Sequence, residues 1–471
     1  MRVTRTVKTI SLFGILALLA SGCLSAKDNK SDTAQNSKAK NVTLTIASNS
    51  ISGGKSSEEA DWITKYVIPE FVKQQKAKGV TAKVTFNPSG VDDEQYKAKL
   101  ALDLKTRGGA DVLSLDGIWI GEFAEAGYIK PLDEVVGAKA KAWDGWSQIP
   151  ESVQEIMKYN NKNYGIPGGT DGRVLFYNKA LFAKAGISVP WQPKSWDEIL
   201  ATGRALKKVS GVTPIQINAG TAMGEATTMQ GVLPLLVGTG KGVYDQDTKK
   251  WQGASTSVKS VLNFYKEIYG GGLGDPILQQ EAKGRDKSFQ EFAAGKIGIL
   301  LEGDYFWRSV IEPKAGVAPM KNRDRDVGYA KIPAEAPGKG LKGQDFVTMM
   351  GGGGRVINPN TKYPQQAFEL LAFMNSAEAV KAALAGTTRI TQRTDVNDEV
   401  LKRDPMLQFV ASEVAPLGFV RPGLAVYPQV SSLLQQATGD IVSGKSPEEA
   451  AAAYQVALEK AVGGADHVDR T

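Results

Sequence analysis

Short strand-like runs alternate with helical stripes along most of this chain, and this alternation limits the fold more than any other feature. Residues 42–46 alternate between polar and apolar side chains, whereas residues 111–115 form a short apolar run typical of a buried parallel strand. Between these runs, Tyr96, Leu100 and Leu104 recur every four residues and predict one face of a helix. Strands and helices in this order predict an α/β fold whose sheets carry helices on both faces.

The same alternation continues toward the C-terminus. Residues 174–177 and 297–301 predict two more strands. Ser195 and Ser446 each stand three residues before a Glu, which is the capping-box pattern of a helix start. Residues 364–375 predict a helix with Pro in its first turn. Because 471 residues exceed one ordinary core, we expect two domains or more.

Charge and composition exclude several classes of function. The chain has 57 Lys and Arg against 50 Asp and Glu, a net charge of +7 with both signs mixed throughout. Nucleic-acid binding needs a clustered basic face, so no nucleic-acid partner is expected. A single Cys excludes an internal disulfide and a Cys-based zinc site. The only His, His467, stands near the C-terminus, so a Ser-His-Asp mechanism is not expected, and neither is a metal or a cofactor.

The N-terminus has the three regions of a secretion signal: a basic start, an apolar run over residues 10–20, and small residues before Cys23. The apolar run is too short to span a bilayer stably. Residues 19–23 resemble a bacterial lipobox, in which the Cys receives a lipid, although Ala20 stands where Leu is commoner. The resemblance implies that residues 1–22 are a signal peptide and that Cys23 anchors an extracytoplasmic protein to the cell membrane. A plain signal peptide with an incidental Cys is the alternative.

A polar tether is expected after the signal. Residues 23–41 hold the lipidated Cys and a segment rich in Ser, Lys, Asp and Asn, with almost no apolar side chains. This composition predicts a flexible linker. A coil of about 18 residues spans roughly 25 Å, so the body should lie near the membrane and touch it through the lipid anchor only.

Six motifs between residues 42 and 463 resemble, in order, landmarks of the extracellular solute-binding proteins of bacterial ABC importers. The most similar group includes maltose-binding proteins and many oligosaccharide-binding lipoproteins. The motifs lie at residues 109–116, 123–132, 164–167 followed by 175–179, 182–186, 195–198 and 292–298.

The resemblance implies two α/β lobes of the periplasmic-binding-protein type, with a ligand cleft between them and three crossings of the chain from lobe to lobe. The crossings are expected near Asp171, Val347 and Asp404. The expected division is 42–170 plus 351–403 for lobe one, 171–346 plus 404–463 for lobe two, and 464–471 for a loosely structured tail.

A sugar would suit such a cleft on chemical grounds. A pyranose has an apolar face that an aromatic ring can cover, and Asp, Asn and Arg can bind adjacent hydroxyls in pairs. In open α/β sheets, ligands gather beyond the carboxyl ends of strands. Asn49, Asp116 and Trp119 each follow a predicted strand and are therefore candidate ligand-binding residues. A simple turn, a helix cap and a core Trp are their respective alternatives.

The resemblance adds candidates at the first crossing and after the strand at residues 297–301. Arg173 resembles an Arg that often faces the ligand in this family, and Asp171 stands beside it; a hinge salt bridge is the alternative. Asp304, Tyr305 and Trp307 stand where the family often has a Trp that stacks on sugar. One of the two aromatic residues is expected to face the cleft, and the sequence does not distinguish between them.

The remaining candidates also rest on the resemblance. Gly352 and Gly353 belong to a four-glycine run where the family has a crossing whose backbone approaches the ligand. A phosphate-binding loop would lead into a helix, whereas this run leads into strand-like residues 355–357. Arg389 resembles an Arg in a family segment whose Pro is here replaced by Thr. Arg421 is a candidate from the last part of the chain, with a surface role as its alternative.

These features together predict a non-enzymatic receptor that binds a sugar or oligosaccharide and delivers it to the permease subunits of an ABC importer. It is expected to be a monomer that closes about a hinge. A secreted glycoside hydrolase is the leading alternative and would need a carboxylate pair such as Asp116 with Asp304. A receptor for iron or a polyamine and a surface adhesin are further alternatives.

The substitution Cys23→Ser tests the anchor. It should abolish lipidation and release the protein from membranes, because the lipobox resemblance makes the Cys23 sulfur the lipid acceptor. Detergent-phase partitioning of the two proteins from expressing cells measures this. Equal membrane partition of parent and variant would show that Cys23 carries no lipid.

Overall fold

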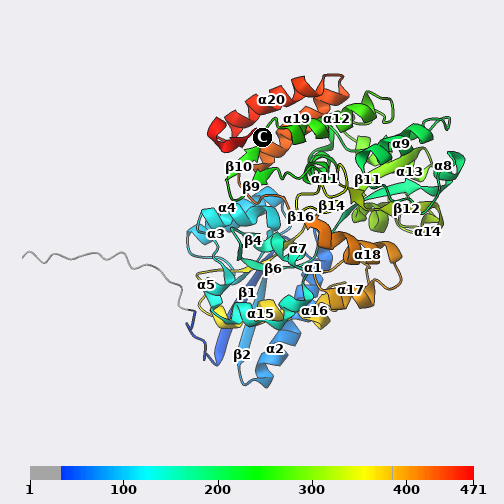
Figure 1. Ribbon diagram of the computed structural model, residues 1–471. Coiled ribbons are helices and arrows are strands. Elements are labelled where there is room, and N and C mark those ends of the chain that lie inside the picture. Colours follow the sequence, from blue (N-terminus) through cyan, green and yellow to red (C-terminus); the bar gives the residue numbers. More distant parts are fainter. Residues whose placement is uncertain (1–32, 385) are drawn as a thin grey trace, which may run out of the picture.

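The computed structural model of the chain describes residues 33–384 and 386–471 (Figure 1). The predicted signal peptide and Cys23 lie outside the described residues. Two mixed sheets, each with its own buried core, form the two α/β lobes that the sequence predicts. In this part of the chain no helix is both long enough and apolar enough to cross a membrane.

The first lobe is built on a five-stranded sheet with the order β2-β1-β3-β15-β6. β1 pairs in parallel with β2 and with β3, whereas β15 runs antiparallel to β3 and to β6. The strands are β1 (Asn41–Ser48), β2 (Thr81–Pro88), β3 (Val112–Asp116), β6 (Gly165–Pro167) and β15 (Gly353–Ile357). The strands predicted near residues 42–46 and 111–115 are confirmed.

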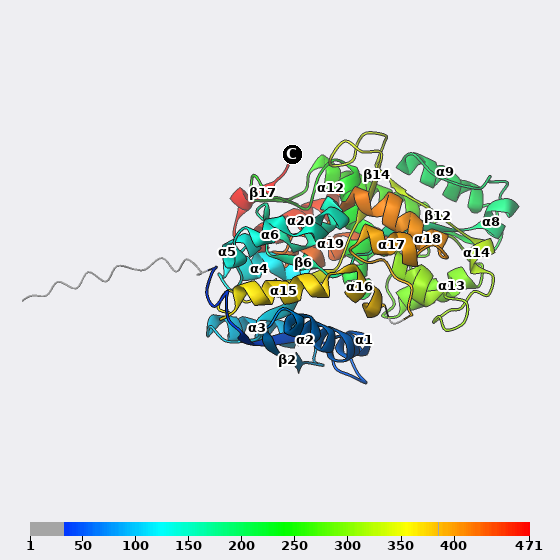
Figure 2. The ribbon, with the colours of Figure 1, turned by 90° about the horizontal axis from the view of Figure 1, so that it is seen from below.

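A wide helical turn interrupts the first long helix of this lobe. α1 (Ser57–Trp62) and α2 (Ile68–Ala77) are joined by a π-helical turn at Ile63–Val67. Pro69 lies in the first turn of α2, where its missing N–H weakens the regular hydrogen-bond ladder. Figure 2 shows α1, α2 and α3 (Asp93–Lys105) grouped with β2.

The second lobe is built on a four-stranded sheet with the order β12-β7-β11-β8. β7 runs antiparallel to both of its neighbours, and only β11 and β8 are parallel. The strands are β7 (Arg173–Asn178), β8 (Thr213–Gln216), β11 (Ile297–Gly303) and β12 (Val327–Ala330). The direction of β7 does not follow from local periodicity, because it depends on partners far away in the sequence.

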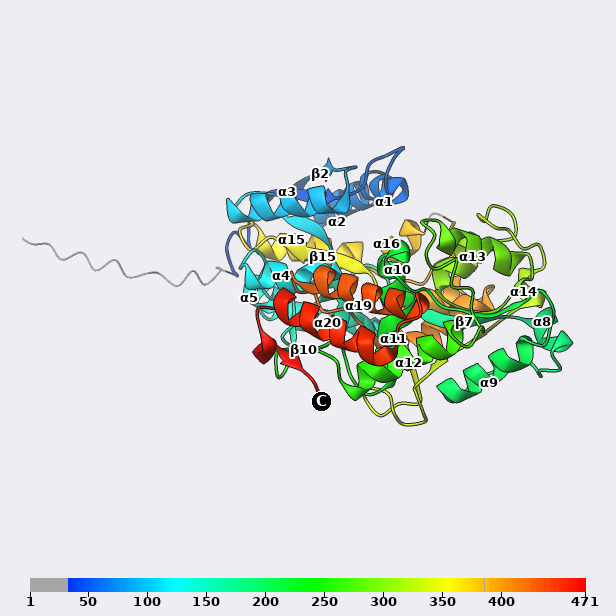
Figure 3. The same cartoon turned by 90° about the horizontal axis from the view of Figure 1, so that it is seen from above.

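Helices cover the second sheet where the caps and stripes predict them. Ser195 accepts a hydrogen bond from the Glu198 N–H, and Ser446 forms a complete capping box with Glu449. Figure 3 shows α12, α19 and α20 lying side by side. The main helices of this lobe are α9 (Trp196–Leu206), α12 (Thr256–Tyr269), α13 (Gly284–Ala293), α19 (Tyr427–Val442) and α20 (Pro447–Ala461).

The chain passes between the two sheets more than once. β6 belongs to the first sheet and β7 to the second, so residues 168–172 connect the lobes. β14 (Phe346–Met349) pairs with β13 (Ile332–Pro333), and the chain then enters β15 of the first sheet. After α17 (Thr394–Val400), residues of α18 (Pro405–Phe409) pack in the same cluster as residues of β7. The lobe boundaries stay predictions.

The N-terminal segment is held against the first lobe at its described end. The Gln365 side-chain amide donates to the Thr33 carbonyl (2.6 Å) and the Gln366 amide to the Asn36 carbonyl (2.9 Å), both from α15 (Pro364–Met374). Asn36 also donates to the Lys362 carbonyl (2.9 Å). The expectation of a flexible tether up to residue 41 is therefore wrong for residues 33–40, because side chains of α15 bind the carbonyls of Thr33, Asn36 and Ser37, and the Lys40 carbonyl accepts from the Thr81 N–H.

The C-terminal tail is also more ordered than expected. Val468–Asp469 forms β17, which pairs in parallel with β10 (Lys250–Gln252) of the second lobe. Val468 is buried and belongs to the same hydrophobic cluster as Trp251. The expectation of a loosely structured tail over residues 464–471 is therefore wrong for this strand, whose apolar side chain completes a core.

Candidate functional site

A cleft of about 880 Å³ lies between the lobes. The first lobe contributes the ends of β1 and β3, the start of α1 and the glycine run before β15. The second lobe contributes Asp304 and Arg308. Eight of the twelve residues predicted to bind ligand line this cleft: Asn49, Asp116, Trp119, Asp171, Asp304, Gly352, Gly353 and Arg389. Their roles as ligand contacts stay predictions.

The wall formed by the first lobe carries an Arg that sequence reasoning missed. Arg355 of β15 donates to the Glu59 carboxylate (2.5 Å), and its guanidinium lies 5.0 Å from the centre of the Trp62 ring. Trp62 is fixed in turn by a hydrogen bond from its indole N–H to the Ala379 carbonyl (2.9 Å). The sequence signal for Arg355 is a charged residue within an otherwise apolar strand. Its partners Glu59 and Trp62 could not be identified from it, because they stand 296 and 293 positions away (355 − 59 and 355 − 62).

Three candidates on the first lobe also hold the local backbone. Asp116 accepts a hydrogen bond from the Ile118 N–H (3.1 Å), and Trp119 is buried with its ring 6.4 Å from that of Tyr96. Burial raises the pKa of Asp116, and the Ile118 N–H only partly opposes this. The Asn49 amide donates to Asp93 (2.9 Å) and fixes the neighbouring loop. Asp116 thus caps a helix, Trp119 packs in the core and Asn49 stabilises a turn, as the alternatives predict, and all three residues also line the cleft.

The glycine run lets three backbone segments approach one another. A side chain on Gly353 would meet the Leu115 carbonyl of β3, and one on Gly352 would meet the Gly169 carbonyl. Gly352 also has φ +136°, a conformation that L-residues rarely adopt. The backbone here forms the floor of the cleft directly.

Asp171 joins two of the segments that connect the lobes. Its carboxylate accepts from the Gly351 N–H (2.6 Å) and from the guanidinium of Arg173. Arg173 also donates to the Met349 carbonyl (3.1 Å), and its own backbone N–H donates to the Thr348 hydroxyl (2.8 Å). Burial raises the pKa of Asp171, but the Arg173 charge and the Gly351 N–H together lower it by more. The pKa of Asp171 therefore lies below its usual value.

Arg173 is buried and does not line the cleft. Its hydrogen bonds are those of the hinge salt bridge that the sequence left as the alternative. A direct ligand contact for Arg173 stays a prediction.

Asp304 is the buried carboxylate of the second lobe at the cleft. Its backbone N–H donates to the Gly172 carbonyl (2.9 Å), and its Oδ2 accepts from Arg308 Nε (3.1 Å). Its Oδ1 has no hydrogen-bond partner among the described residues. Burial, followed by the nearby negative charge of Asp171, raises the pKa of Asp304 to about 6.

The two aromatic residues after β11 have opposite environments. Trp307 is 3% exposed, packs in a hydrophobic cluster and donates its indole N–H to the Asp404 carboxylate (3.0 Å). Tyr305 is 43% exposed, and the guanidinium of Arg308 lies 5.6 Å from its ring centre. Tyr305 is therefore exposed beside the cleft residues Asp304 and Arg308 without itself lining the cleft, whereas Trp307 belongs to the core.

The two remaining arginines lie at different places. Arg389 is exposed at the cleft and donates weakly to the Ala383 carbonyl (3.4 Å). Arg421 is half-buried and lines a small cavity of about 40 Å³, which Gly351 and Gly352 also line. It donates there to Glu225 (3.0 Å), which also accepts from the Tyr427 hydroxyl (2.7 Å).

The described residues contain no group of three or more His, Cys, Asp or Glu side chains arranged to hold a metal ion. The polar groups at the cleft are instead carboxylates, guanidiniums, amides and backbone groups, with aromatic rings beside them. This set can form paired hydrogen bonds to a polar ligand and cover its apolar faces.

Comparison with known proteins gives a consistent result. The family described as bacterial extracellular solute-binding protein matches residues 54–381. A binding protein of Brucella abortus is 25% identical over 335 residues, covering 70% of this chain and 74% of its own length. The diacetylchitobiose-binding protein of Streptomyces coelicolor is 22% identical over 362 residues, covering 75% and 77%. The structure of a sugar-binding protein of Xanthomonas citri superposes with a TM-score of 0.70 at 17% identity, covering 89% of this chain and 97% of that one.

The substitution Asp304→Asn tests the electrostatics of the cleft. An Asp has an ordinary pKa of about 3.9 in an unfolded chain, and the folded protein raises the pKa of Asp304 to about 6. The folded state thus binds the proton of Asp304 more tightly than the unfolded state does. Protonation of Asp304 therefore stabilises the fold fully below pH ~4, and this stabilisation is lost as the pH rises to about 6. Relative to the parent, Asp304→Asn should gain on the order of 2–3 kcal/mol of unfolding free energy between about pH 4 and pH 7.

Urea unfolding of both proteins across this pH range measures the difference. Asp247→Asn, at an exposed carboxylate of the second lobe, controls for the loss of one negative charge. A difference between Asp304→Asn and parent that does not change with pH would contradict the raised pKa.

Proposed function

Because the chain belongs to the bacterial extracellular solute-binding protein family, we propose that it captures a sugar or oligosaccharide in the cleft between its lobes. The composition of the cleft supports this proposal most directly, because paired charged side chains lie beside aromatic rings there. The relatives that bind diacetylchitobiose and other sugars support the same class of ligand.

The proposed ligand lies against both lobes. On the first lobe, Trp62 and Trp119 offer apolar surface and Asp116 offers a carboxylate oxygen. On the second lobe, Asp304 Oδ1 lacks a partner among the described residues, and a ligand hydroxyl that donates to it would offset the cost of its burial. Tyr305 would cover a ring face, because its own ring is the exposed one of the pair after β11.

Ligand binding would close the cleft. A ligand that touches both lobes favours the closed state only by the contacts that the open state lacks. The segments joined through Asp171 and Arg173 are the proposed hinge, and the glycines beside them can absorb changes in backbone dihedrals.

The proposed place of this receptor is outside the cytoplasm, on the cell membrane. Cys23 would carry the lipid after removal of residues 1–22, and the protein would act as a monomer that delivers its ligand to the permease subunits of an ABC importer. No catalytic step is proposed, because the family and the relatives are binding proteins. Long incubation with oligosaccharides should accordingly leave them uncleaved.

A thermal-shift screen of mono- and oligosaccharides on residues 33–471 tests the proposed ligand class. This body contains all the described helices, strands and core clusters. A sugar at a concentration of about 100 times its Kd should add about 2.7 kcal/mol to the unfolding free energy. If amino acids, polyamines or metal ions raise the melting temperature and sugars do not, the sugar proposal is wrong.

Tyr305→Ala should weaken binding of a sugar found in that screen by at least about 1 kcal/mol, because the contact of an aromatic ring with a ligand face is worth roughly this much. The melting temperature of the free protein should change little, since Tyr305 is largely exposed. Trp307→Phe is the matched variant and should lower stability while leaving affinity unchanged, because Trp307 is a core residue bound to Asp404. Calorimetric titration of both variants measures the affinity. If both bind the sugar as tightly as the parent does, Tyr305 does not contact the ligand.

A further inference from the structure

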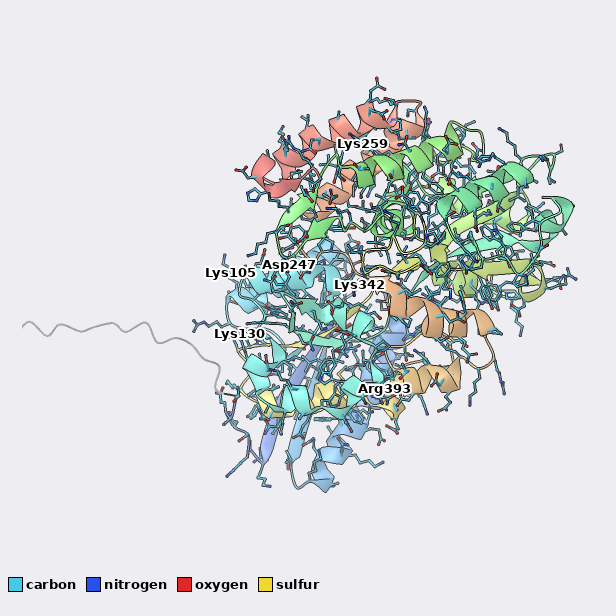
Figure 4. All side chains as sticks on the ribbon, in the orientation of Figure 1. Lys105, Lys130, Asp247, Lys259, Lys342 and Arg393 are labelled. Carbon is cyan, nitrogen blue, oxygen red and sulfur yellow. The ribbon has the colours of Figure 1, made fainter. Side chains whose placement is uncertain are left out.

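A second groove, of about 800 Å³, lies on the first lobe and shares no residue with the ligand cleft. It is formed by the end of α3, the segment after α4 (Ile120–Glu125), and residues 359–364 before and at the start of α15. The charged residues that line it are Lys105, Arg107 and Lys130, and no Asp or Glu is among its lining residues. Figure 4 shows Lys105 and Lys130 on the same side of the first lobe.

Acidic residues near this groove have partners of their own. Asp103 pairs with Lys99 (2.6 Å) and Asp133 with Lys141 (2.8 Å). Asp111 accepts from the Thr361 hydroxyl (2.5 Å). Lys99 and Lys141 thus offset the charges of Asp103 and Asp133, and the exposed charges of Lys105 and Arg107 favour an anion at the groove.

Two of the three cations stand free at the rim. The side chains of Lys105 and Arg107 are exposed and have no ion pair with any described residue. Leu102 lies one turn before Lys105 on the same side of α3 and is 62% exposed. An exposed apolar side chain next to free cations fits an interface in which phosphate groups lie above hydrocarbon.

The position of the N-terminal segment connects this groove with the membrane. Gln35 lines the groove, and the α15 amide of Gln365 holds Thr33 next to it. Thr33 stands ten positions after Cys23, and a chain of this length reaches at most about 35 Å. A lipid on Cys23 would therefore keep this end of the first lobe, rather than the opposite end of the molecule, close to the membrane surface.

We propose that the groove lined by Lys105, Arg107 and Lys130 binds the phosphate of anionic phospholipid headgroups and turns this end of the first lobe toward the membrane. This role goes beyond the capture of a solute, uses a surface that shares no residue with the cleft, and replaces the expectation that the body touches the membrane through the lipid anchor only. The body would then be held by two elements, the lipid on Cys23 and the basic groove, and the second lobe would be left free to move about the hinge.

Co-sedimentation of residues 33–471 with vesicles tests the proposal without any contribution from the lipid anchor. The body should bind vesicles that contain phosphatidylglycerol and not vesicles of phosphatidylcholine alone, and salt at about 0.5 M should weaken the binding by screening. The double variant Lys105→Glu with Arg107→Glu should lower partition to the anionic vesicles about tenfold or more, since each basic residue at such a surface contributes about a fivefold preference.

Lys259→Glu with Lys342→Glu is the matched control, because it makes the same change in net charge on the second lobe (Figure 4). This control should keep the parent's partition. Equal loss in both double variants, or no preference for anionic vesicles, would overturn the proposal. Complete competition by millimolar glycerol phosphate would also overturn it, by assigning the groove to a free phosphate compound. The Lys105→Glu, Arg107→Glu variant should bind sugar as the parent does. A negative result with vesicles would therefore reject the phospholipid site and leave the proposed sugar binding untouched.

Discussion

The carboxylate of Asp171 joins two chain segments that pass from one lobe to the other, and the geometry of the cleft depends on this contact. It accepts from the Gly351 N–H and from Arg173, whose guanidinium also holds the Met349 carbonyl. Loss of the carboxylate would leave a buried Arg without its charge partner, which is far more costly than loss of a surface pair. This connection lies at the glycine run, directly before the starts of β7 and β15.

The same connection creates opposite electrostatic conditions at neighbouring carboxylates. Asp171 is stabilised as an anion by Arg173, and its charge helps to raise the pKa of the nearby Asp304. Asp304 is left with one unpartnered oxygen in the described residues. A polar ligand that donates a hydrogen bond to this oxygen would offset the free-energy cost of burying it unpaired. Binding and closure would then be coupled through Asp304.

Local patterns in the sequence predict much of the fold, and distant partners explain what they miss. The strand at residues 42–46 and the helix after Ser446 follow from side-chain period and capping, which depend only on near neighbours. The direction of β7 and the docking of residues 33–40 depend on partners far along the chain. At the site, the candidates after strand ends could be named, but the contact of Arg355 with Glu59 could not, because no local signal links them.

Capture of a ligand in the proposed way requires that the two lobes close on it about the segments joined by Asp171. Small-angle X-ray scattering of residues 33–471, with and without a sugar that raises the melting temperature, measures this motion directly. The radius of gyration should fall at saturation, because closure removes solvent from the cleft and draws the lobes together. An unchanged radius of gyration at a saturation verified by calorimetry would contradict closure about this hinge.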